Sequence, residues 1–303
     1  MTTVLSIEHS TQYDYEHDVI LAQHLAYLHL QDSPWQKVRQ HELVITPEPT
    51  YLQQQHDAFG NQRSYFSITK PHRCLVVQSR STVAKKARYH GFDLALTEPW
   101  EQVREAMVYS LEQPFVPASE FVWPSTYVGW HENLKAYALR AFLPGRPIGQ
   151  ASMALCQQIY DDFTYESGST QIHTPMQAAF NDRKGVCQDF AHIMIGCLRA
   201  IGLAARYVSG YLLTTPPEGQ PRLRGADASH AWVAVYCPNA PGHWLELDPT
   251  NATIADLDHI CIAQGRDFGD VSPLKGIIRG GGHHQLQIAV TVEPMAATSQ
   301  SAL

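Results

Sequence analysis

The stretch Gly185-Val186-Cys187-Gln188-Asp189-Phe190-Ala191 places a cysteine where an irregular segment is predicted to become a helix. From Phe190 onward, apolar residues recur at the spacing of a helix with one buried face, at Phe190, Ile193, Met194, Cys197, Leu198 and Ile201. Gly202 follows at a position where glycine commonly ends a helix. We therefore expect Cys187 in the first turn, where the helix dipole and free backbone N–H groups favour a thiolate. Position alone leaves two interpretations open, a catalytic nucleophile and a small buried apolar side chain.

After Gly202 the apolar pattern changes to a period of two, which predicts strands over residues 204–213, 229–237 and 243–247. A turn over 238–242, rich in proline and glycine, joins the second strand to the third. The third strand must stop at Asp248-Pro249, because proline cannot continue a ladder of hydrogen bonds. A helix followed by an antiparallel meander indicates an α+β catalytic core.

Two titratable residues of this predicted hairpin are candidates for chemistry with Cys187. His230 begins one strand and Asp248 ends its partner, at nearly equal distances from the turn, so they can be cross-strand neighbours on one face. A carboxylate in that place can orient an imidazole, which can take the thiol proton of Cys187 or pair with the thiolate. Singly, a strand histidine is often just exposed and an aspartate before proline is often a turn residue. The three together, in this order, favour catalysis.

The remaining chain divides by composition. Residues 1–90 contain short alternating runs separated by turn residues, which predicts a small all-β sandwich domain. Residues 91–147 are predicted to be a helical connector packed on the catalytic core. The catalytic domain is assigned to 148–293, including a strand near 286–292, and residues 294–303 are expected to be a disordered tail.

The composition excludes several classes of function. A formal charge of −7 and a pI near 6.1 argue against nucleic-acid binding, and without a long apolar stretch we expect no membrane span. Six scattered cysteines without C-x-x-C spacing or a signal sequence indicate reduced thiols and a cytoplasmic protein. The sixteen histidines include no H-E-x-x-H motif, so neither a metal nor another cofactor is expected.

At these motifs the chain resembles the transglutaminase-like superfamily. The matching segments are residues 185–191, Ala226 to Val233 and Trp244 to Asn251. The N-terminal region, with Asp57-Ala58-Phe59-Gly60-Asn61, resembles the amino-terminal region that precedes this core in a group of bacterial proteins. Residues 270–273 and 280–292 also fit, so the resemblance covers nearly the whole chain.

The resemblance implies a papain-like α+β core with a Cys-His-Asp triad. Cys187 would be the nucleophile, His230 the general base and acid, and Asp248 the orienting carboxylate. The implied chemistry is acyl transfer at an amide through a thioester, on a peptide or protein substrate that could present a glutamine side chain. An amine or water as acceptor would give transglutamination, deamidation or peptide hydrolysis. The Cys187 backbone N–H is a natural oxyanion donor, whereas the sequence identifies no second donor.

Other points stay open or depart from the family. No acidic run would make a calcium site, so the calcium dependence of animal transglutaminases is not carried over. Asp189 has two interpretations, a residue that tunes the site and a solvated acid of the first helical turn. An alternative function is a catalytically idle module that binds peptides or proteins on the same core. The oligomeric state is unknown from the sequence.

Overall fold

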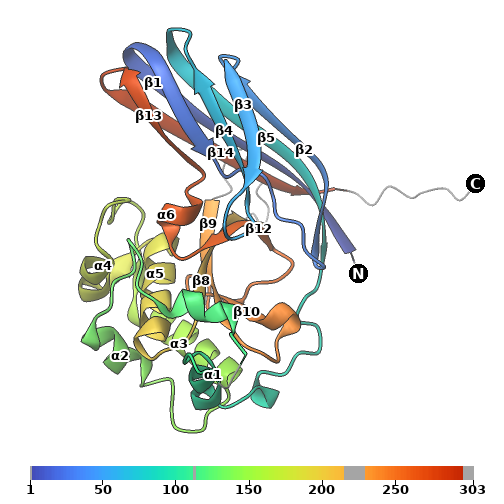
Figure 1. The fold of residues 1–303 in the computed structure, drawn as a ribbon, viewed down its shortest axis with the longest axis vertical. Coiled ribbons are helices and arrows are strands. Elements are labelled where there is room, and N and C mark those ends of the chain that lie inside the picture. The colour runs from blue at the N-terminus through green and yellow to red at the C-terminus, as the bar shows by residue number, and fades with distance from the viewer. Residues whose placement is uncertain (1, 112–113, 215–228, 296–303) are drawn as a thin grey trace, which may run out of the picture.

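A computed structural model describes residues 2–111, 114–214 and 229–295. Long strands gather at one end of the molecule and the helices at the other, which gives two lobes (Figure 1). The strand lobe is built from residues 2–86 and 274–294, and thus from both ends of the sequence. The core lobe takes up the middle of the chain.

The strand lobe is one seven-stranded hydrogen-bonded sheet. Its strands are β1 Thr2–Ala26, β2 Gln36–Thr46, β3 Tyr51–His56, β4 Gln62–Ile68, β5 His72–Lys86, β13 Leu274–Gly280 and β14 His284–Pro294. The long strand β1 is interior, because Leu5 pairs with Val83 of β5 on one side and with Pro294 of β14 on the other. Farther along, β4 and β13 flank β1 in the same way.

The strand lobe confirms the all-β character of residues 1–90, and its apolar core includes Phe66 and Leu75. The boundary of the lobe differs from the predicted domain boundary. Residues 274–293, predicted to lie in the catalytic domain, instead pair with β1. Pro294 ends β14, and residues 296–303 of the predicted tail lie outside the described residues. Periodicity identifies a strand but not its distant partner, which explains why β13 and β14 were assigned to the wrong domain.

The helices of the core lobe are α1 Trp100–Ala106, α2 Glu132–Ala138, α3 Ile148–Asp162, α4 Met176–Asp182, α5 Cys187–Ala200 and α6 Phe268–Val271. Short 3-10 turns cover Leu94–Leu96, Pro117–Val122 and Pro241–His243. Helices α1 and α2 lie in the predicted connector, and their buried Trp100 and Leu134 belong to the same apolar core as α5. No helix in the described ranges combines the length and apolar character needed to cross a bilayer.

The core lobe also contains a five-stranded sheet in the order β11-β10-β9-β8-β12. Its strands are β8 Ala205–Leu212, β9 Ser229–Tyr236, β10 Trp244–Asp248, β11 Thr253–Ile254 and β12 His259–Gly265. The three strands predicted after Gly202 correspond to β8, β9 and β10. The antiparallel pairing of β9 with β10 confirms the predicted hairpin.

Helix α5 is the centre of the core lobe. Residues Asp189 to Ala200 are all buried, so the helix is covered on every side and not on one face alone. Gly196 shows how closely its neighbours approach, because an added Cβ would lie 2.9 Å from Leu134 of α2 and 3.1 Å from Met176 of α4. The predicted apolar stripe therefore describes only part of the surroundings of α5. An amphipathic pattern underestimates burial where small residues let further helices cover the opposite face.

Candidate active site

The start of α5 presents Cys187 through a built N-terminal cap. The Asp189 carboxylate accepts a hydrogen bond from the Val186 backbone N–H at 2.9 Å and one from the Thr170 hydroxyl at 2.6 Å. Asp189 is only 3% exposed, which excludes the interpretation as a solvated first-turn acid. A Cβ at Gly185 would lie 2.7 Å from the Asp189 carboxylate, so this close turn requires glycine. The cap fixes the residue before the thiol, and thereby the thiol itself.

A short parallel strand pair supports the same turn from the other side. In this pair Tyr165 of β6 Thr164–Tyr165 lies opposite Gly185 of β7 Lys184–Gly185. The Glu166 N–H donates to the Gly185 carbonyl at 3.0 Å. Tyr165 is half exposed at 52%, and its ring packs edge to face on Phe190 of α5, with centroids 6.3 Å apart. A partly exposed aromatic side chain thus lies against the start of the helix that carries Cys187.

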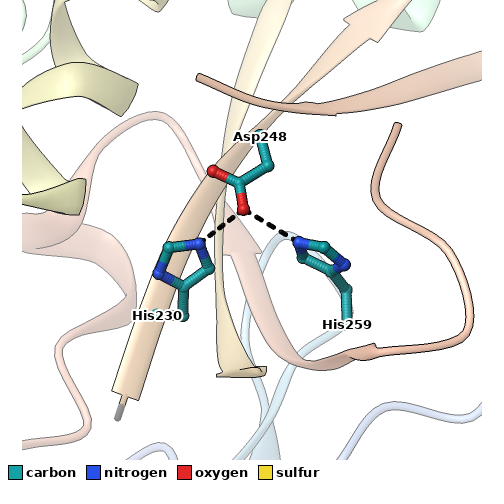
Figure 2. Close-up of side chains that lie close together, drawn as sticks. All are labelled: His230, Asp248 and His259. Atoms are coloured by element: carbon teal, nitrogen blue, oxygen red, sulfur yellow. Dashed lines mark hydrogen bonds and ion pairs between the residues drawn. The ribbon is translucent and has the colours of Figure 1, made fainter. Parts of the chain in front are cut away.

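His230 and Asp248 are neighbours across the β9–β10 hairpin, as the sequence predicts. Leu247 pairs with Val233, and continuing this register puts Asp248 opposite Trp232, two residues from His230 and on the same face. The His230 Nε2 and the Asp248 Oδ2 are 2.7 Å apart, and both side chains are buried (Figure 2). This is the geometry of a carboxylate that orients an imidazole ring.

His230 also makes a hydrogen bond with the Cys187 side chain. Because Asp248 occupies Nε2, the nitrogen left for the thiol is Nδ1. Burial by itself would lower the pKa of His230, but the hydrogen bonds and charges of Asp248 and Cys187 outweigh it and raise the pKa from 6.5 to about 10. The structure therefore brings all three predicted site residues into one hydrogen-bonded series, in which the imidazolium is the favoured form of His230.

Asp248 has more donors than a simple triad needs. Its Oδ2 accepts from His259 Nε2 at 3.0 Å and from Asn251 Nδ2 at 2.6 Å, and its Oδ1 accepts from the Thr250 N–H at 2.9 Å. Figure 2 shows the carboxylate between the rings of His230 and His259. Burial would raise the pKa of Asp248, but the hydrogen bonds from the two histidines outweigh it and hold the pKa well below its usual range.

His259 is the main site residue that the sequence analysis missed. It begins β12, which pairs with β8 at one edge of the sheet. The strand before it in the chain, β11, lies at the other edge. A hairpin can be predicted from the spacing around one turn, whereas this placement requires the order of five strands. The only local signal is a histidine at a strand start, which is too common to identify a site.

His230, Asp248 and His259 are also the residue types that hold transition metals, and their ligand atoms lie within 4.8 Å of one another. Their geometry fits hydrogen bonding better than coordination. Two ligand atoms on one tetrahedral zinc ion are separated by more than about 3 Å, given bond lengths near 2 Å. The His230–Asp248 distance of 2.7 Å is shorter than that and typical of a charge-assisted hydrogen bond.

Tyr207 of β8 is a second residue that the sequence analysis did not single out. It is 3% exposed. Burial, followed by the proximity of Cys187 and Asp189, raises its pKa well above the ordinary value. Tyr207 therefore stays a neutral hydroxyl, and its ring packs on His192 of α5 with centroids 5.1 Å apart. Nothing in its own segment distinguishes this tyrosine from one that only fills the core.

Family models match both lobes. Residues 5–84 match the bacterial transglutaminase-like N-terminal region, and residues 140–249 match the transglutaminase-like superfamily. An uncharacterised protein of Mycobacterium tuberculosis is 40% identical over 293 residues, which are 95% of this chain and 92% of that protein. The chain therefore belongs to the transglutaminase-like superfamily.

Two further similarities concern an enzyme and a fold. A protein-glutamine gamma-glutamyltransferase of Pseudomonas aeruginosa is 31% identical over 136 residues, which are 42% of this chain and 20% of that enzyme. A solved structure from Cytophaga hutchinsonii, of a protein proposed to be a cysteine protease, superposes with a TM-score of 0.75 at 20% identity. The superposition covers 98% of this chain and 92% of the chain from Cytophaga hutchinsonii. The predicted fold class, an all-β region before a papain-like transglutaminase core, is thus confirmed.

Proposed function

We propose that the protein is a cysteine-dependent enzyme of acyl transfer at amide bonds, with Cys187 as nucleophile, His230 as general acid and base, and Asp248 as the orienting carboxylate. The observation that carries this proposal is the hydrogen-bonded series from Cys187 through His230 to the buried Asp248. A buried carboxylate, an imidazole with a raised pKa and a thiol at a helix start form the combination that thiol nucleophiles use.

The chemistry follows from this arrangement. The Cys187 thiolate attacks the carboxamide carbonyl carbon, and the backbone N–H at the first position of α5 stabilises the oxyanion. The His230 imidazolium gives its proton to the leaving nitrogen as the C–N bond breaks, which leaves a thioester on Cys187. Water or an amine then attacks the thioester and gives up a proton to His230, and the thiolate leaves.

The proposed substrate is a peptide or protein that carries an amide. The similarity to a protein-glutamine gamma-glutamyltransferase supports a glutamine side chain as the acyl donor. Half-exposed Tyr165, which packs on Phe190 at the start of α5, offers an apolar surface against which the substrate chain could lie. The acceptor decides between amine incorporation and hydrolysis, and the triad serves both. All six cysteines are free, which supports action in a reducing compartment such as the cytoplasm.

The test is the reactivity of Cys187 together with turnover. We expect iodoacetamide at pH 6 to label Cys187 at least about tenfold faster than a model thiol, because an ion pair supplies thiolate at a pH where free thiols are protonated. Cys187→Ala should abolish ammonia release from a glutamine-containing peptide and incorporation of a primary amine into it. Cys74→Ala removes another partly exposed cysteine and is the matched control. Slow labelling and unchanged turnover in Cys187→Ala would refute the proposal and favour an idle binding module.

A further inference from the structure

A second histidine, outside the triad, contacts the catalytic carboxylate candidate. His259 Nε2 donates to the same Asp248 oxygen that His230 contacts (Figure 2). The ring is 5% exposed and meets the Trp232 ring edge to face, with centroids 5.2 Å apart. The Trp232 indole is in turn anchored on the Glu246 carboxylate at 2.8 Å. His259 is therefore packed and oriented as tightly as His230.

The backbone that carries His259 is held from the strand lobe. Lys85 of β5 donates its ammonium to the His259 carbonyl at 2.6 Å. The Gln36 side chain at the start of β2 bonds both backbone groups of Cys261, accepting from the N–H at 2.9 Å and donating to the carbonyl at 2.7 Å. Lys85 and Gln36 are 7% and 2% exposed. These contacts cross between the lobes beside a cavity of about 190 Å³ that His259 also lines.

Burying Lys85 in this place costs free energy. Burial lowers the pKa of its ammonium, and no ion pair found among the described residues includes it. Its short bond is made to a backbone carbonyl of the strand that carries His259. A buried cation used in this way indicates that the position of this strand matters.

We propose that His259 is a positioning residue that holds Asp248 ionised and aimed at His230, and that Lys85 and Gln36 extend this support to the strand lobe. This inference rests on the proposed function of the triad. With His259 present, the buried carboxylate has a donor on the side away from His230, so it cannot turn from the imidazole without losing a charge-assisted bond. Without it, Asp248 is less strongly ionised and less fixed, and it stabilises the His230 imidazolium less.

The test compares two substitutions at one position. His259→Leu removes the donor, whereas His259→Gln keeps an N–H close to the place of Nε2. We expect the alkylation rate of Cys187 at pH 6 to fall about tenfold in His259→Leu, the effect of one pKa unit, and to stay within about threefold of wild type in His259→Gln. In turnover, His259→Leu should lower kcat and leave KM nearly unchanged. His24→Leu replaces a buried histidine of β1 that is remote from the site, and is the matched control.

An NMR titration of the His230 ring separates this inference from the proposed function, since it needs neither a reactive thiol nor a substrate. His230 should titrate at lower pH in His259→Leu than in the wild type and in His24→Leu. A folded His259→Leu variant with wild-type alkylation and an unchanged His230 titration would overturn the positioning role while the triad stands. An unreactive Cys187 in the wild type would overturn the proposed function, and a shifted His230 titration would still support the coupling through Asp248.

Lys85→Met gives a second test, because it keeps the apolar stem and leaves His259 and Asp248 intact. We expect a fall in alkylation rate in the same direction, about threefold, with the His230 titration also moved to lower pH. If Lys85→Met matched the wild type in both measurements, Lys85 would not help to position His259. The proposed support of His259 by the strand lobe would then be refuted.

Discussion

At the scale of single residues, the site depends on a charge that is buried and fully bonded. Asp248 is 0% exposed and receives hydrogen bonds from two imidazoles, one amide side chain and one backbone N–H. Burying an isolated carboxylate would be costly, so these donors are what keeps it ionised. Its negative charge then favours the imidazolium form of His230, the ring that faces Cys187.

Asp248→Asn tests this charge while preserving the shape of the side chain. We expect kcat/KM to fall about a hundredfold or more, because the His230 imidazolium loses its counter-ion. The raised pKa of His230 also stabilises the fold: this contribution is fully present below pH 6.5 and is lost as the pH rises toward about 10. Urea unfolding of both proteins should therefore show the largest stability difference between about pH 5 and 6.5, narrowing at higher pH. A stability difference that did not narrow between pH 6.5 and about 10 would contradict the ion pair.

At the scale of elements, the turn into α5 decides where the thiol lies. Asp189 caps the helix from within, and Asp189→Ala would leave the Val186 N–H and the Thr170 hydroxyl without their acceptor. We expect a loss of about 1 kcal/mol in unfolding free energy, typical of a lost N-terminal cap, and a larger fractional loss in Cys187 alkylation rate. Asp189→Asn retains a carbonyl acceptor and should preserve most of both. Equal behaviour of the two variants would show that the cap does not position Cys187.

The elements also show what the sequence could predict. Cys187 lies in the first turn of α5, as the sequence predicts, and the hairpin spacing places His230 beside Asp248. These features arise from contacts within one helix or around one turn, which periodicity and turn residues encode. The contact of His259 with Asp248 and the pairing of β14 with β1 join segments that no helical period or turn connects. The contact of His259 depends on the order of the strands in the core sheet. The pairing of β14 depends on β1 having an edge that the strands near it in sequence leave unpaired.

At the scale of the whole molecule, the two lobes are interlocked by sequence as well as by contact. The chain leaves the strand lobe after β5, builds the core lobe, and returns to complete the first sheet with β13 and β14. Between the lobes, Lys85 and Gln36 of the strand lobe form hydrogen bonds with the backbone of the strand that carries His259. A family region that matches residues 5–84 is therefore not a separable unit in this fold, because its sheet needs residues 274–294.

Truncation tests this interdependence. A chain that ends at Pro273 lacks β13 and β14, which would expose the paired edge of β1 and remove the buried Val290 and Val292. We expect the melting temperature to fall by about 10 °C or more, since fully burying one such side chain contributes roughly 1.5–3 kcal/mol and 1 kcal/mol corresponds to about 2–4 °C at this size. Cys187 alkylation should slow as well, because a loosened β5 and β2 hold Lys85 and Gln36 less firmly. A chain ending at Met295 keeps β14 whole and is the reference. If the shorter chain melted and reacted like that reference, the C-terminal strands would be dispensable, and the strand lobe would be a unit independent of the core.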